Sequence, residues 1–232
     1  SIQDGILIPR WAPDLFFGYG YPFFNFYAPL SYYVAEGFHV LGLGFVGSIS
    51  ATFTLGFVLS GAFMYLFARD LAGPWAGVLA ALAYVFAPYH LVNAHLRGDL
   101  AEFFAFVWFP AILWAAGRLM SRGGSGYLGL TALLYGARLT THNIMALAFS
   151  PRLAAYVVFL LIGSRVKGQE SRPGFRVQGS GARLGRGLKS LTALDPAATR
   201  AICAFLAIAL AFGLSAFFWV PALSQVDDIQ IG

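Results

Sequence analysis

Side chains that could take part in chemistry gather in four polar patches, which long apolar runs separate. The patches lie at residues 4–27, 89–102, 140–143 and 225–228. A carboxylate in such a patch could act as a general base toward a hydroxyl group, and an arginine could bind a phosphate through its paired donors. The candidates that the patches supply are Arg10, Trp11, Asp14, Tyr19, Tyr21, Asn25, Arg97, Glu102, His142 and Asn143.

The chemistry of each side chain suggests a role. Asp14 and Glu102 are the catalytic candidates, and the remaining candidates would bind substrate. Among these, Arg10 and Arg97 suit a phosphate group. The aromatic side chains of the first patch, Trp11, Tyr19 and Tyr21, could stack on a sugar or line an entrance for a lipid.

Each group also has a purely structural interpretation. The aromatic residues of the first patch could form an interfacial belt, and Arg97 with Glu102 could be a local ion pair at a helix start. His142 and Asn143 could cap a helix. The spacing of His90 and His95 does not place both on one helix face, so no metal ligands are assigned.

The composition excludes several classes of protein. Of the 232 residues, 59% are hydrophobic and 11% are charged, and the mean hydropathy is +0.71. Soluble domains are usually about 45–50% apolar and about 25% charged, which excludes a water-soluble enzyme and a disordered chain. The net charge of +5 does not indicate nucleic-acid binding, because eight of the 15 Lys and Arg lie within residues 165–200. The single Cys203 excludes an intramolecular disulfide.

We therefore expect an all-α, polytopic bundle of transmembrane helices, each of which needs roughly 20 apolar residues. Pro151 is expected to break the fifth span beside Arg152, and Pro221 to end the sixth. The run 29–47 contains Glu36 and His39, so it is predicted to be an interfacial helix that does not cross the membrane. The six predicted spans are 48–68, 74–92, 100–120, 127–141, 144–163 and 201–220.

The distribution of basic residues orients this bundle. Residues 164–199 hold seven Lys and Arg and only two acids, so this loop is predicted to be cytoplasmic. Residues 1–47 then form an outer loop, 48–163 contain five transmembrane helices, 200–221 form the sixth, and 222–232 begin an outer segment. All four polar patches fall on the outer face of a plasma membrane. Helix packing would have to bring Arg10, Arg97, Glu102 and His142 around one cavity.

The sequence also resembles a known family across nearly its whole length. It is similar to prokaryotic integral membrane proteins called "6-pyruvoyl-tetrahydropterin synthase-related", and through them to GT-C glycosyltransferases and YfhO-like membrane proteins. The matching motifs are GILIPRWAPD at 5–14, GYGYP at 18–22, FYAPLSYY at 26–33, RGDLAE at 97–102, THN at 141–143 and SAFFWVPAL at 215–223.

The resemblance implies a GT-C-like fold with a large first outer loop and a sugar donor linked to polyprenyl phosphate. In that fold the principal acid follows the first span, so we expect it upstream of Ser1, in a longer protein of which this chain is an internal part. The expected function is transfer of a sugar to a cell-envelope acceptor. The alternative is a non-catalytic transporter, flippase or assembly subunit. The expected partners are the bilayer and a lipid-linked sugar, and a divalent metal cofactor is left open.

Overall fold

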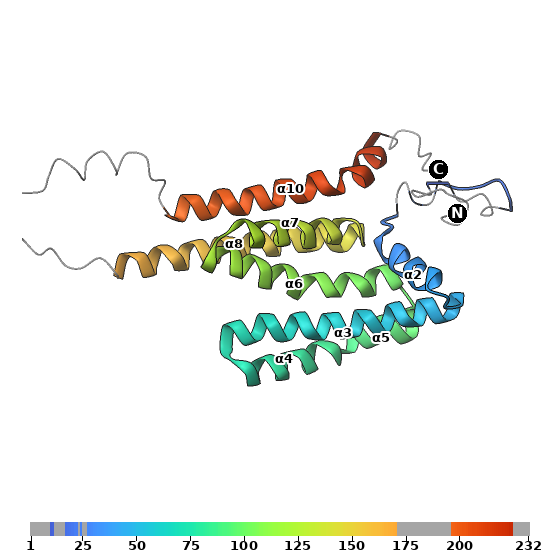
Figure 1. The fold of residues 1–232 in the computed structure, drawn as a ribbon, viewed down its shortest axis with the longest axis horizontal. Coiled ribbons are helices and arrows are strands. Elements are labelled where there is room, and N and C mark those ends of the chain that lie inside the picture. The colour runs from blue at the N-terminus through green and yellow to red at the C-terminus, as the bar shows by residue number, and fades with distance from the viewer. Residues whose placement is uncertain (1–9, 12–16, 23, 25–26, 171–195, 225–232) are drawn as a thin grey trace, which may run out of the picture.

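The chain folds as a bundle of helices (Figure 1). The computed structural model describes residues 10–11, 17–22, 24, 27–170 and 196–224, and within them it contains no β-strand. The fold class is therefore all-α, as the composition predicts. The elements are α2 (Leu30–Val40), α3 (Phe45–Ala72), α4 (Pro74–Val85), α5 (Pro88–Val92), the π-helical turn η1 (Asn93–Arg97), α6 (Leu100–Arg122), α7 (Ser125–Leu139), α8 (Asn143–Glu170) and α10 (Pro196–Ser224).

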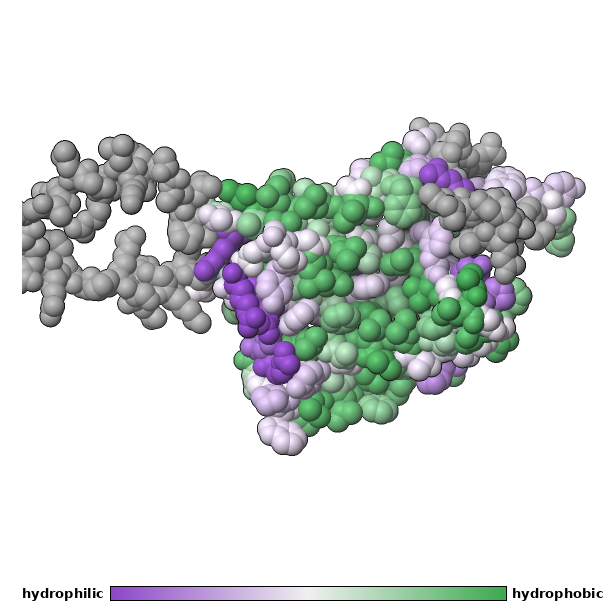
Figure 2. Space-filling view, viewed as in Figure 1, coloured by the Kyte–Doolittle hydropathy of each residue, from purple (hydrophilic) through white to green (hydrophobic). Residues whose placement is uncertain are grey.

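The long helices run alternately in opposite directions between two ends of the bundle (Figure 1). One end, here called the α2 end, carries α2, the start of α6, the turn between α7 and α8, and the end of α10. The other end, here called the arginine end, carries Arg69, Arg118 and Arg122 near helix ends. Hydrophilic side chains gather at both ends, and a hydrophobic band lies between them (Figure 2).

This band has the length that a membrane span requires. The helices α3, α6, α8 and α10 are long and apolar enough to cross a bilayer, and the bent pair of α4 with α5–η1 would make a fifth span. The sequence predicted six spans. The helix α7, with 15 residues, falls short of the length criterion, although it lies along α6 between the two ends (Figure 1). This architecture is compatible with a multi-pass membrane protein.

The second predicted span is broken near its middle. The helix α4 ends at Val85, and the axis turns by 42° before α5 begins at Pro88. Ala87 has an extended ψ of 133°, because a residue that precedes proline is disfavoured in the helical region. The predicted span over 74–92 is therefore a bent pair of helices and not one straight helix.

The predicted interfacial helix over 29–47 is shorter than expected. It consists of α2, which ends at Val40, and a turn that leads into α3 at Phe45. Gly42 has a φ of +99° in this turn, a conformation that favours glycine. Figure 1 shows α2 inclined to the long helices at one end of the bundle, and its 11 residues are too few to cross a bilayer.

Two prolines that were expected to interrupt helices lie inside them. The helix α8 continues through Pro151 to Glu170, and α10 continues through Pro221 to Ser224. A proline inside a membrane helix is tolerated where the backbone carbonyl that it leaves without an N–H donor finds another donor. The predicted break at 150–152 and the predicted end at Pro221 are both wrong.

Side chains from other parts of the chain supply such donors to two carbonyls. The Tyr84 hydroxyl donates to the Phe106 carbonyl at 2.9 Å, which lacks its helical donor because residue 110 is Pro. Arg10 donates to the Phe217 carbonyl at 3.4 Å, four residues before Pro221.

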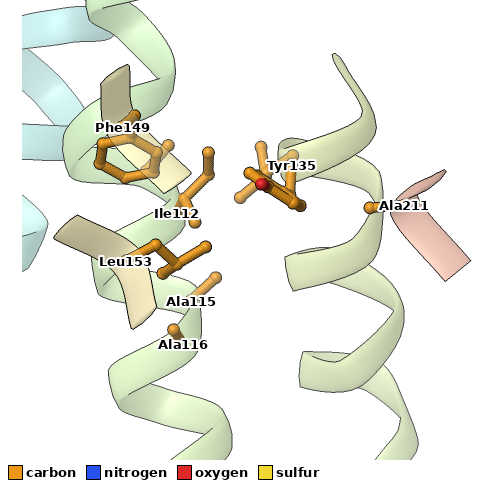
Figure 3. Close-up of a cluster of buried hydrophobic side chains, with 9 residues drawn as sticks. Ile112, Ala115, Ala116, Tyr135, Phe149, Leu153 and Ala211 are labelled. Carbon is orange, nitrogen blue, oxygen red and sulfur yellow. The ribbon is translucent and has the colours of Figure 1, made fainter. Parts of the chain in front are cut away.

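The core is centred on α6, which has buried residues along most of its length. Side chains of α6, α7, α8 and α10 meet in one cluster; Figure 3 shows Ile112, Tyr135, Phe149, Leu153 and Ala211 converging there. The sequence feature that permits this contact is small residues, since an added Cβ at Gly136 would lie 3.3 Å from the Ala211 carbonyl oxygen. Close packing of this kind drives helix association in membranes.

Candidate functional site

The candidate site lies at the α2 end, where η1 turns sharply into α6. Gly98 adopts a left-handed conformation with a φ of +61° and ends η1. Asp99 then caps α6, and its Oδ1 accepts a hydrogen bond of 2.9 Å from the Glu102 backbone N–H. An Asp followed three residues later by a Glu is a sequence signature of a helix start. This turn brings Arg97, Asp99 and Glu102 together.

Glu102 is the centre of a group of polar side chains. It is 5% exposed, and its Oε2 lies 2.9 Å from Nη2 of Arg97. Its Oε1 accepts hydrogen bonds from Tyr89 and, at 3.2 Å, from Nη1 of Arg97. Tyr89 also accepts a hydrogen bond from Arg97 at 3.0 Å. Both carboxylate oxygens are therefore occupied, which fits the expectation of a local Arg97–Glu102 pair.

His142 reaches this group from the turn between α7 and α8. Asp99, Glu102 and His142 each offer a ligand atom, and these atoms all lie within 4.8 Å of one another. We call these residues the Asp99–Glu102–His142 cluster. Two carboxylates and an imidazole are side chains that can bind a divalent cation or accept a proton. The sequence analysis weighed only His90 and His95 as metal ligands and assigned none.

One ring nitrogen of His142 is already used in a hydrogen bond. Its Nδ1 accepts a hydrogen bond of 3.3 Å from the Met145 backbone N–H at the start of α8. In a neutral imidazole the other ring nitrogen, Nε2, then carries the proton. His142 therefore acts as a helix cap, as one interpretation of the sequence expected, and also belongs to the cluster.

Two phenols connect the first segment of the chain with the cluster. The rings of Tyr27 and His142 lie 6.4 Å apart between centroids, and those of Tyr27 and Tyr32 lie 5.9 Å apart. Burial, and then the neighbouring Tyr32 and Asp99, raise the pKa of Tyr27 above its usual value. Burial also raises the pKa of Tyr32. Both phenols therefore stay protonated at neutral pH and can donate hydrogen bonds.

The backbone holds this part of the first segment in place. The Leu30 N–H at the start of α2 donates to the Thr140 carbonyl at the end of α7, at 2.9 Å. Thr141 is fully buried, and its hydroxyl accepts a hydrogen bond of 2.8 Å from the indole of Trp108 in α6. The cluster is therefore assembled by α2, η1, α6 and the turn between α7 and α8.

One buried cation, Arg138, lies near the cluster. Arg138 is fully buried, and it donates to the carbonyls of Ala105, at 2.8 Å, and Met145. Its guanidinium lies 3.9 Å from the ring centroid of Phe109 and 4.8 Å from that of Phe149. Its Nε has no hydrogen-bond partner among the described residues. The sequence analysis did not select Arg138, because nothing in the pattern of α7 shows which face is buried.

The other predicted site residues do not join the cluster. Arg10 contacts the end of α10, on the side of the bundle away from α5 (Figure 1). Trp11 lies against Gly20, and both Trp11 and Tyr19 are exposed. Tyr21 is also exposed, and Asn143 is exposed at the first residue of α8. Asp14 and Asn25 lie outside the described residues.

The predicted grouping of four side chains is therefore only partly formed. Arg97, Glu102 and His142 come together, whereas Arg10 does not, because it donates to the Phe217 carbonyl freed by Pro221. Three members of the site were not selected from the sequence: Tyr27, Tyr89 and Asp99. The pattern of Asp99 and Glu102 at a helix start was a usable signal for Asp99. Tyr27 and Tyr89 lie within the polar patches at 4–27 and 89–102, but nothing in their local pattern marked them as site residues.

Comparison with known proteins adds one distant relative. No protein-family model matches the chain, and no solved structure matches it. An uncharacterized protein of Lactococcus lactis subsp. cremoris (strain MG1363) is 21% identical over 233 residues, which are 98% of this chain and 34% of the relative. The chain thus spans about a third of the length of the curated relative that it matches.

Proposed function

We propose that this chain is part of a GT-C-like membrane glycosyltransferase that transfers a sugar from a polyprenyl-phosphate carrier to an acceptor hydroxyl. The α2 end would face the outside of a plasma membrane. The observation that carries the proposal is the assembly of Arg97, Asp99, Glu102 and His142 at one end of a bundle of apolar helices. Such a position suits chemistry on a lipid headgroup.

Arg97 is the proposed phosphate ligand. Its side chain is 45% exposed, so part of the guanidinium remains accessible while Glu102 and Tyr89 orient the rest. In the reaction the acceptor oxygen bonds to the anomeric carbon as the bond from that carbon to the phosphate oxygen breaks. The electron pair leaves with the lipid phosphate, whose charge Arg97 would stabilise.

Asp99 is the proposed general base, in place of Glu102. Both oxygens of Glu102 are bound by Arg97 and Tyr89, so Glu102 is better suited to positioning Arg97. Asp99 uses Oδ1 to cap α6, whereas its Oδ2 has only a distant contact of 3.9 Å with Arg97. That oxygen could take the proton of the acceptor hydroxyl.

The test compares full-length protein variants in an assay of sugar transfer from polyprenyl-phosphate donors. Asp99→Asn keeps a good N-cap but removes the base, so we expect transfer to fall by about 100-fold or more. Arg97→Ala should also lose transfer. Arg10→Ala is the matched control, because it removes an arginine at the same end that lies outside the cluster. Its transfer should remain near that of the wild type.

A non-catalytic transporter or flippase for envelope glycolipids is the second candidate. The broken span formed by α4 and α5, with its 42° bend, favours it, because discontinuous helices line the substrate sites of many transporters. The two candidates differ in reconstituted vesicles. Movement of a lipid-linked sugar between leaflets without any transfer product would support the transporter and refute the glycosyltransferase. Normal transfer by Asp99→Asn would remove Asp99 from the mechanism.

A further inference from the structure

A cavity of about 470 Å³ opens at the arginine end of the bundle, between α3, α6 and α8. It lies at the opposite end from the Asp99–Glu102–His142 cluster (Figure 1). Its volume falls within the range of about 300–1,000 Å³ that is common for small-molecule sites. The cavity has an apolar wall, which includes Phe67, Leu113 and Leu160, and a polar rim.

One part of the rim is held rigidly. Arg118 and Asp70 form a two-pronged ion pair, with Nε–Oδ2 at 2.5 Å and Nη2–Oδ1 at 2.7 Å. The indole of Trp114 donates to the same carboxylate at 2.9 Å. A fork–fork pair of this kind fixes the plane of the guanidinium. Asp70 is therefore already neutralised and adds little repulsion toward an anion.

Two further donors at the cavity, Arg122 and the Tyr156 hydroxyl, have no hydrogen-bond acceptor among the described residues. Arg122 is exposed at the last residue of α6 and forms no hydrogen bond or ion pair with another described residue. The Tyr156 hydroxyl lies against Gly117, where an added Cβ would be 3.0 Å from it. Arg69 and Arg118 both pair with the carboxylate of Asp70, and Arg122 also lines the cavity. These four side chains together carry two positive charges in excess.

The apolar wall indicates what kind of anion fits. Phe67 and Leu160 lie on helices that could span the membrane, so the cavity adjoins the hydrophobic band of the bundle (Figure 2). A free phosphate would leave this wall uncovered. An amphiphile with an anionic head and acyl chains would satisfy both parts, since basic pockets between transmembrane helices bind anionic lipid headgroups.

We propose that this cavity binds one anionic phospholipid of the leaflet at the arginine end. Arg122 would bind the phosphate through paired donors, and the Tyr156 hydroxyl would reach the polar part of the headgroup. The acyl chains would lie along Phe67 and Leu160. This site is separate from the proposed catalytic cluster and does not depend on the proposed function.

The test measures lipid binding to the full-length protein in detergent by native mass spectrometry. Phosphatidylglycerol is compared with phosphatidylcholine, whose headgroup has no net charge, and with glycerol 3-phosphate, which has no acyl chains. Two variants remove the same charge at the same end. Arg122→Gln changes the cavity, whereas Arg200→Gln, near the start of α10, changes a residue that does not line it.

We expect one phosphatidylglycerol to be retained in preference to phosphatidylcholine. Arg122→Gln should weaken its binding about five- to tenfold, the effect of one basic residue near an anionic surface, and Arg200→Gln should leave it unchanged. Equal losses in both variants would show a general surface charge effect and overturn the proposal. So would unchanged binding in Arg122→Gln, or glycerol 3-phosphate binding as tightly as the whole lipid.

Discussion

The hydrogen bond from Tyr84 to the Phe106 carbonyl should be coupled energetically to Pro110. Replacing Tyr84 with Phe keeps the ring, which packs edge-on against His90 and Phe106, and removes only the hydroxyl. The Phe106 carbonyl then has no donor, because residue 110 has no N–H. Hydrogen bonds between membrane helices contribute on average about 0.6 kcal/mol and at most about 1.7 kcal/mol.

We expect Tyr84→Phe to lower the free energy of unfolding by about 1 kcal/mol, because a carbonyl left without a donor costs more than an average bond. The second variant, Pro110→Ala, restores an N–H at the position where the helix would donate to Phe106. In that background Tyr84→Phe should cost only about 0.3 kcal/mol, the level of ordinary non-additivity. The cavity left by removing the proline ring is present in both Pro110→Ala proteins and cancels in the cycle.

The measurement is unfolding of the four proteins in mixed micelles with increasing SDS, followed by tryptophan fluorescence. The coupling energy is the difference between the two Tyr84→Phe effects, and we expect about 0.7 kcal/mol. Equal effects of Tyr84→Phe in the two backgrounds would show that the hydroxyl does not replace the missing helical donor. The reasoning about prolines in this bundle would then be wrong.

Three further predictions follow from packing, burial and orientation. Gly56→Ala places a Cβ 2.5 Å from a buried ring of α6, so it should lower the free energy of unfolding by about 1–3 kcal/mol. Gly126→Ala, with open space around its Cβ, should leave the free energy of unfolding unchanged or raise it. Equal effects of the two substitutions would refute the close contact at Gly56. Arg138→Ala should lower the free energy of unfolding by about 3 kcal/mol or more, because two hydrogen bonds from a charged donor are lost. An Arg138→Ala protein that unfolds at the same SDS concentration as the wild type would contradict this. The Tyr19→Cys variant should react with a membrane-impermeant thiol reagent in intact cells, and the Ser121→Cys variant should react only after the membrane is permeabilised. The reverse pattern would show that the proposed orientation is inverted.

The sequence predicted well those features that depend on continuous apolar runs. The spans at 48–68 and 100–120 agree with α3 and α6 to within a few residues, because each run ends in charged residues. It did not predict how prolines behave, since the donor that satisfies a freed carbonyl comes from a distant segment. Tyr84 and Arg10 are such donors, and no local pattern identifies their acceptors.

Like the fold, the candidate site was predicted only in part. The pairing of Arg97 with Glu102 is local and could be predicted from their spacing, and His142 joined them because both lie at turns on the same end. Arg10 was expected to bind a phosphate because it lies in the predicted outer loop. Its contact with the Phe217 carbonyl could not be predicted from the sequence. Arg138 was missed because a buried guanidinium between aromatic rings leaves no signature.

The side chains that cap proline-freed carbonyls have a consequence for biosynthesis. Tyr84 precedes Phe106 in the chain, and Arg10 precedes Phe217. When α6 or α10 leaves the ribosome, the donor for its open carbonyl has therefore already been synthesised. A helix α6 with an open carbonyl at Phe106 is costly in lipid on its own, so α6 would leave the insertion machinery together with α4, whose Tyr84 supplies the donor. Pro110 would thereby couple the insertion of α6 to the presence of α4.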